Sequence, residues 1–152
     1  MDWTAYYQQH QITADEAVAK IRSGNRIVIG HACGEPAHLV RAMVRHAAEL
    51  ENVEVVHMVA MGECAYVEPG MEKHFRHNAI FVGSKTRDAV NSGRGDFTPC
   101  FFFEVPRLFH TTIPLDVAMI TVAPPDENGM VSLGVSVGYD FEAVKTAKLV
   151  IA

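Results

Sequence analysis

The chain has 152 residues, of which 49% are hydrophobic and 20% charged, and its formal net charge at pH 7 is −5. These values are typical of one globular domain with a single buried core. The negative charge and scattered Lys and Arg residues argue against nucleic acid as a partner. No apolar run approaches the roughly 18 residues of a membrane span, so we expect no membrane partner.

The cysteines and the first residues bear on the cellular compartment. Cys33, Cys64 and Cys100 are odd in number and form no CxxC pair, which argues against a disulfide scaffold and a structural zinc site. The N-terminus lacks a basic region followed by an apolar core. We therefore expect a cytoplasmic protein with no bound metal.

The first predicted unit is a short helix followed by a strand. Thr13 and Glu16 have the spacing of a capping box, which predicts a helix to about residue 22. Residues 23–25 contain Gly24 and end that helix. The apolar residues 26–30 then predict a strand.

The segment after this strand, Gly30-His-Ala-Cys-Gly-Glu-Pro36, predicts a loop that leads into a helix over residues 36–50. In open α/β proteins, ligands collect where a strand ends and a helix begins, because free backbone N–H groups there bind anions and carbonyl oxygens. We therefore expect a binding site in this loop.

The remaining elements repeat the alternation of strand and helix. Strands are predicted at residues 53–59, 79–82, 101–103, 115–122 and 148–152, and helices at 84–91 and 140–147, with a broken segment at 60–78. The strands are apolar on both faces, as in parallel sheets that helices cover on both sides. The predicted fold class is α/β, an open, mainly parallel sheet with helices on both faces.

Four segments of the chain resemble the N-terminal domain of the acetyl-CoA hydrolase/transferase family, within the family I CoA-transferases. Residues 30–36 are similar to the family's Gly-x-x-x-Gly-x-Pro loop, and the other three segments are 81–96, 103–109 and 124–136. Their order along the whole chain makes the resemblance specific. The similarity is strongest to the branch that acts on 4-hydroxybutyrate, or on butyrate and acetate.

This resemblance implies two related α/β domains with the active site between them. Residues 1–152 then correspond to the N-terminal domain, and the C-terminal catalytic domain, with its nucleophilic Glu, lies outside the chain. The uncovered last strand at 148–152 fits the same expectation. The family transfers CoA between an acyl-CoA and a short-chain carboxylate through a glutamyl-CoA thioester. Coenzyme A is then a substrate, no cofactor is needed, a homo-oligomer is expected, and this chain alone holds no catalytic residue and is inactive.

The predicted substrate-binding residues belong to the loop and to the end of the second strand. They are Gly30, His31, Ala32, Cys33, Gly34, Glu35, Pro36, Met58 and Met61. His31 can donate to a substrate carboxylate or hydroxyl, or else bond to the backbone as an ordinary loop histidine.

Several of these residues also have a purely structural interpretation. We expect Cys33 to be buried beneath the loop and Glu35 to complement the dipole of the following helix. Met58 and Met61 either line an acyl pocket or belong to the core.

Weaker candidates lie elsewhere. His74 and His77 have a spacing compatible with one face of a surface helix, without a third metal ligand. Arg87, Arg94 and Asp96 either cap the cleft in a loop or form ion pairs. Ser132 and Ser136 follow a turn at 125–129 and are candidates to approach the site.

Three alternative functions remain open at this stage. The chain is compatible with a non-catalytic acyl-CoA or nucleotide-binding module, with an assembly domain, and with part of an acetyl-CoA hydrolase. A dinucleotide fold is disfavoured because the first loop has only Gly30 and Gly34 and lacks Gly-x-Gly-x-x-Gly.

Overall fold

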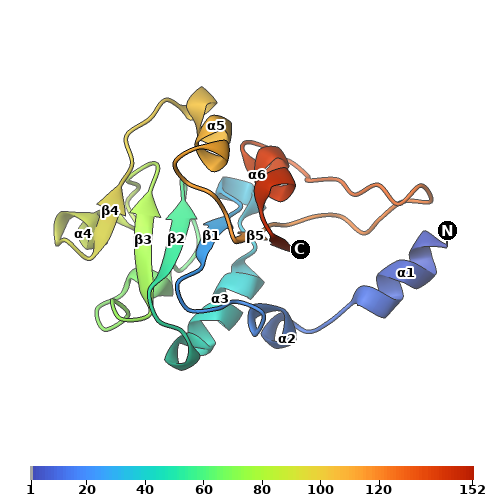
Figure 1. Ribbon diagram of the computed structural model, residues 1–152, viewed down its shortest axis with the longest axis horizontal. Helices are drawn as coiled ribbons and strands as arrows, with labels where there is room; N and C mark the ends of the chain where they lie inside the picture. Colours follow the sequence, from blue (N-terminus) through green and yellow to red (C-terminus); the bar gives the residue numbers. More distant parts are fainter. Residues whose placement is uncertain (1) are drawn as a thin grey trace.

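A computed structural model describes residues 2–152, and its centre is one sheet of six strands (Figure 1). The strands are β1 Arg26–Ile29, β2 Val53–His57, β3 Phe75–Ala79, β4 Gly95–Phe97, β5 Val117–Met119 and β6 Leu149–Ile151. Their spatial order is β4-β3-β2-β1-β5-β6, and every neighbouring pair is parallel. The predicted open parallel α/β sheet is confirmed.

Helices cover both faces of this sheet. On one face lie α2 Ala14–Val18 and α3 Ala37–Arg45, and on the other lie α5 Val105–His110 and α6 Asp140–Thr146. Two buried clusters correspond to the two faces: Ile27 and Ile29 pack with α2 and α3, whereas Val28 packs with α5 and α6. This alternation follows from the period of two along a strand.

The predicted first unit is present, although its helix α2 ends at Val18 and not near residue 22. Thr13 and Glu16 form the capping box, since Thr13 Oγ1 accepts from the Glu16 N–H at 3.2 Å and Glu16 Oε2 accepts from the Thr13 N–H at 2.8 Å. Strand β1, the loop and α3 follow in order. Helix α3 ends at Arg45 and is continued by a 3₁₀ turn at Ala47–Glu49, where a single helix to residue 50 was expected.

The predicted strand at 79–82 was misplaced, because β3 occupies Phe75–Ala79. Polar Arg76, His77 and Asn78 hide its strand character in the sequence. The expected surface helix around His74 and His77 is therefore wrong: His77 is buried in β3, and burial lowers its pKa to about 4.

The predicted strand at 101–103 is also wrong. Phe102–Glu104 is a 3₁₀ turn, and the edge strand is β4, in the segment that was expected to be a glycine-rich loop. Three successive aromatics favour a strand by propensity, but these side chains are exposed, and residues 101–103 pair with none of the six strands.

Helix α4 Arg87–Asn91 lies beside β4, and helix α1 Trp3–His10, which was not predicted, lies away from the sheet (Figure 1). The segment 120–138 runs out from β5 and returns to α6. Its turn at Asp126–Met130 confirms the predicted turn, and Gly129 at its tip lies against the Trp3 ring of α1. Among residues 2–152, no helix is long and apolar enough to cross a membrane.

Candidate functional site

The strand order places the site at one point of the sheet. From β1 the chain moves outward through β2, β3 and β4, and then returns to add β5 and β6 on the other side of β1. The loops that leave β1 and β5 therefore diverge at their carboxyl ends, the place where open α/β sheets bind ligands. Loop 30–36 follows β1, and segment 120–138 follows β5.

His31 lies at this divergence, where it contacts both segments. Its ring stacks on Tyr139, with centroids 4.7 Å apart, and meets Phe102 edge-on at 5.9 Å. The residue is 9% exposed, and neither ring nitrogen has a hydrogen-bond partner. Burial lowers the pKa of His31, so the neutral imidazole offers one donor and one acceptor.

Hydrogen bonds from two side-chain hydroxyls to backbone carbonyls hold loop 30–36 and the end of β1 against residues 136–139. The Ser136 hydroxyl donates to the His31 carbonyl at 2.8 Å, and the Tyr139 hydroxyl donates to the Ile29 carbonyl at 2.6 Å. Ser136 thus reaches the loop as expected, whereas the Ser132 hydroxyl accepts from the Gly134 N–H within its own exposed segment.

Glycines allow these close approaches. A Cβ at Gly34 would lie 2.9 Å from the Ser136 Cβ, and one at Gly30 would lie 3.0 Å from Asp140 Oδ2. Ala32 between them adopts a left-handed φ of 52° at the start of a 3₁₀ turn, Ala32–Gly34. Pro36 precedes α3 as its N-cap residue.

Cys33 is exposed, so the expectation of a buried thiol beneath the loop is wrong. The tight turn directs its side chain outward, while Gly34 and Pro36 take the buried places. Of the two methionines, Met58 is buried in the core beside α5 and α6, and Met61 is 60% exposed at the tip of the next loop.

Glu35 lies just before Pro36, the N-cap residue of α3, and its side-chain hydrogen bonds go to another loop. Its carboxylate turns toward the loop after β2, where Oε2 accepts from the Met61 and Gly62 N–H groups, both at 2.9 Å. Glu35 therefore joins loop 30–36 to loop 58–62.

Two buried groups behind these loops were not predicted. His57, at the end of β2, is fully buried, and its Nδ1 lies 2.8 Å from the Tyr66 hydroxyl. Asp140, the first residue of α6, is 2% exposed, and its Oδ1 has no partner. Burial raises the pKa of Asp140 to about 7. Neither residue lies in a motif, and only the fold brings them near loop 30–36.

The remaining candidates are surface ion pairs. Arg94 pairs with Asp88 at 2.6 Å, and Arg76 pairs with Asp96 at 2.5 Å. These contacts fix α4 and β4 at the far edge of the sheet, so Arg94 and Asp96 lie in an edge structure and do not form a loop over the cleft. Within residues 2–152, no three potential metal ligands come together.

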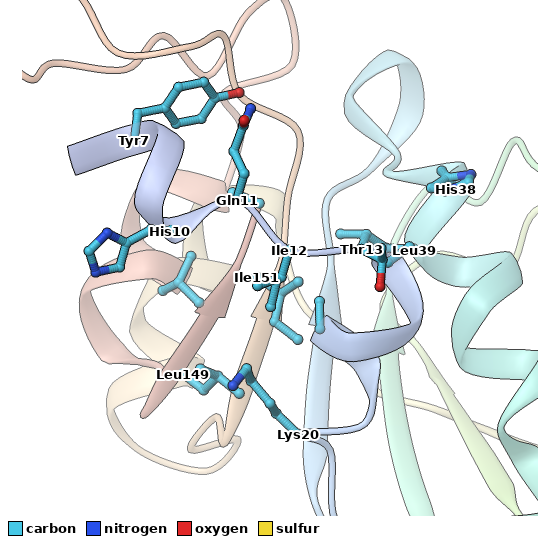
Figure 2. A pocket seen from close by; sticks show the side chains of 14 residues that line it. Tyr7, His10, Gln11, Ile12, Thr13, Lys20, His38, Leu39, Leu149 and Ile151 are labelled. Atoms are coloured by element: carbon cyan, nitrogen blue, oxygen red, sulfur yellow. The ribbon is translucent and has the colours of Figure 1, made fainter. Parts of the chain in front are cut away.

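A hollow of about 450 Å³ lies away from loop 30–36, between the α1–α2 segment and β6 (Figure 2). Its walls include Tyr7 and Ile12 from that segment, Leu39 from α3, and Leu149 and Ile151 from β6. Strand β6 is the edge of the sheet there, and Lys20, His10 and His38 add polar groups to the lining.

Comparison with known proteins gives one consistent result. Residues 1–152 match the acetyl-CoA hydrolase/transferase N-terminal domain. The chain is 53% identical to 4-hydroxybutyrate coenzyme A transferase of Clostridium kluyveri, across 100% of this chain and 36% of that protein. It is 37% identical to succinyl-CoA:cyclohexane-1-carboxylate CoA transferase of Geobacter metallireducens, across 95% and 33%.

A solved structure gives the same relationship. The crystal structure of 4-hydroxybutyrate CoA-transferase from Porphyromonas gingivalis matches with a TM-score of 0.78 and 35% identity, across 97% of this chain and 34% of that one. The chain therefore spans about a third of the length of these relatives.

Proposed function

The chain belongs to the acetyl-CoA hydrolase/transferase family, and from this premise we propose that it forms the N-terminal part of a CoA-transferase. The proposed enzyme moves CoA between an acyl-CoA and a short-chain carboxylate, with 4-hydroxybutyrate as the first candidate and butyrate and acetate as the others. The single observation that carries this proposal is the 53% identity to a 4-hydroxybutyrate CoA transferase over the whole chain.

In the proposed enzyme, the covalent chemistry belongs to a part of the protein outside these 152 residues. In the proposed reaction, a glutamate outside these residues attacks the acyl-CoA carbonyl and releases CoA thiolate, which leaves an acyl-glutamyl anhydride. The thiolate attacks the glutamyl carbonyl, so that glutamyl-CoA forms and the first carboxylate leaves. The second carboxylate then reverses both steps and departs as its CoA ester. Coenzyme A is a substrate throughout, and no cofactor enters the scheme.

Loop 30–36 suits the role of one wall of this site. The anhydride must be shielded from water, which requires a closed cleft with close backbone approach to the acyl group. Gly30 and Gly34 let the loop pack closely against Asp140 and Ser136, which fixes its backbone, and neutral His31 is the proposed donor to the acyl group. Met61, exposed on the neighbouring loop, is the proposed contact for the apolar part of the acyl chain.

The test is an assay of the full gene product. Incubation with acetyl-CoA followed by intact-mass measurement is expected to show a covalent CoA adduct, and initial rates with acetyl-CoA and 4-hydroxybutyrate are expected to follow ping-pong kinetics. Release of free CoA without a carboxylate acceptor would support a hydrolase instead. Binding of acyl-CoA with neither adduct nor turnover would support a non-catalytic module.

A further inference from the structure

Three polar side chains lie buried in a line beneath the two loops of the candidate site. They are Tyr66 in the 3₁₀ turn Ala65–Val67, His57 at the end of β2, and Glu35 in loop 30–36. We propose that Tyr66, His57 and Glu35 are positioning residues that hold loop 30–36 and loop 58–62 at a fixed separation and thereby set which carboxylate fits between them. The substrate part of this inference rests on the proposed function.

The contacts run from the core to the loops. The Tyr66 hydroxyl lies 2.8 Å from His57 Nδ1, and His57 Nε2 lies 3.8 Å from Glu35 Oε2. The same Oε2 accepts from the N–H groups of Met61 and Gly62. The side chains of His57 and Glu35 are 0% and 5% exposed, so water does not screen their interaction.

The protonation states of Tyr66 and His57 follow from their burial. Burial raises the pKa of Tyr66 well above its ordinary value and lowers that of His57 to about 3, so both groups are neutral. Of the two neutral tautomers, the one in which Nδ1 accepts from the Tyr66 hydroxyl carries its proton on Nε2, which then faces the Glu35 carboxylate at 3.8 Å, beyond hydrogen-bond distance. The opposite tautomer would direct a lone pair at that carboxylate.

A role in packing alone does not account for Glu35. A buried carboxylate is costly, and an apolar side chain of similar size would fill the same space with less desolvation. Its hydrogen-bonded partners are backbone amides of the other loop, and Gly62 leaves room for it, since a Cβ there would lie 2.1 Å from Glu35 Oε1. The carboxylate therefore links the two walls, and His57 and Tyr66 orient it.

The experiment compares variants Glu35→Gln, His57→Gln and Tyr66→Phe with His77→Gln in the full gene product. His77 is the control because it is 1% exposed on the adjacent strand β3, and its ring lies 5.7 Å from the Tyr66 ring but forms no hydrogen bond with Tyr66, His57 or Glu35. Its substitution therefore disturbs the packing beside the three residues without removing any of their hydrogen bonds. Thermal melts first establish that each variant is folded, and Tyr66→Phe removes a single oxygen so that the ring still fills its place.

Two measurements then test the proposal. The ratio of kcat/KM for 4-hydroxybutyrate over acetate is expected to change about fivefold or more in the three variants, with the KM for acyl-CoA within about twofold of the parent. Amide hydrogen exchange of peptides covering residues 58–64 is expected to rise in the same variants. His77→Gln is expected to change neither quantity.

A uniform loss of kcat with an unchanged ratio, and exchange equal to that of His77→Gln, would overturn the proposal. If the parent protein transfers no CoA at all, the proposed function fails, but the exchange measurement still decides whether the three residues hold the loops. The two failures are therefore distinguishable.

Discussion

At the scale of single residues, His31 has both a packing role and a proposed binding role. Its ring stacks on Tyr139 and lies in the wall of the proposed site. We expect His31→Ala in the full gene product to raise the KM for the carboxylate about tenfold and the KM for acyl-CoA less than twofold, since a lost hydrogen bond costs about 1 to 1.5 kcal/mol. Steady-state kinetics with both substrates measures this, and unchanged values for both would remove His31 from the site.

Gly138 shows how tightly the same ring is enclosed. Its φ is +40°, and a Cβ there would lie 2.2 Å from His31 Nε2. Gly138→Ala is expected to displace the ring and lower the free energy of unfolding by about 3 kcal/mol, because strain and overpacking add.

The control for this substitution is Gly24→Ala. Gly24 also has a positive φ, +77°, but nothing lies within 4 Å of an added Cβ. Its expected loss is about 1 kcal/mol, from the backbone alone. Urea unfolding measures the free energy of unfolding of both variants. Equal losses would show that the His31 ring moves aside without an energetic cost.

Asp140 predicts a particular pH dependence of stability. Burial raises its pKa from the ordinary value of 3.8 to about 7, so between these pH values the folded chain holds a proton that the unfolded chain has released. Stability from this residue is thus highest at low pH and falls as pH rises toward 7, by at most about 1.4 kcal/mol per unit.

Asp140→Asn removes this titration. The difference in free energy of unfolding, variant minus parent, is expected to increase between pH 5 and pH 7 and to level off above pH 7. Urea unfolding at several pH values measures it. A difference that stays constant across this range would mean that Asp140 is already ionised at pH 5.

At the scale of elements, we expect the stability of helix α2 to depend on the capping box at Thr13. Helix α2 has only five residues, Ala14–Val18, and such a short helix is marginal without capping. Thr13→Ala is expected to lower the free energy of unfolding by about 1 kcal/mol. Thr13→Ser keeps the hydroxyl and is expected to lose a few tenths at most, and equal losses would assign the effect to the methyl group.

The elements that the sequence predicted well are those whose signals are local. The capping box, β1 and the α3 pattern each depend on spacing within a few residues, and all are present. The predicted end of the first helix at residues 23–25 is wrong, because α2 already ends at Val18. Strand β3 was misplaced because its register depends on the neighbour β2, which pairs with it from Val53 to His57. Such long-range pairing can bury a polar residue that no local pattern reveals.

In the candidate site, too, features with a local sequence signal were predicted and features that depend on long-range contacts were not. Loop 30–36 was predicted because glycines and a proline mark it directly. His57, Tyr66 and Asp140 come from three other elements and meet the loop only after the chain folds, so no spacing in the sequence connects them. The hydrogen bonds of Glu35 were missed for a related reason: its partners, Met61 and Gly62, lie on a different loop.

At the scale of the whole molecule, an exposed aromatic cluster follows β4. Phe101 and Phe103 are 71% and 79% exposed and stack with centroids 5.8 Å apart, and Phe102 beside them is 54% exposed. Contiguous apolar surface of this kind marks an interaction face. We expect the 152-residue chain, expressed by itself, to show no CoA transfer and to self-associate through this cluster.

The double variant Phe101→Ser/Phe103→Ser tests that face. It is expected to shift the chain toward monomer in sedimentation velocity at concentrations where the parent associates. Val135→Ser is the control, since Val135 is 86% exposed on the separate segment 120–138. A parent that is monomeric throughout, or a double variant that associates equally, would contradict the prediction.

The strand order also determines when the site can form during synthesis on the ribosome. Strands β1 to β4 pair with neighbours in sequence, but the Tyr139 hydroxyl that closes on Ile29 comes 110 residues later. At ordinary translation rates this is a delay of about 5 to 20 seconds. Throughout it, loop 30–36 has been made but lacks Ser136, Tyr139 and Asp140. The nascent chain therefore makes β1 to β4 and β5 before it can enclose loop 30–36, and only the edge strand β6 is added later.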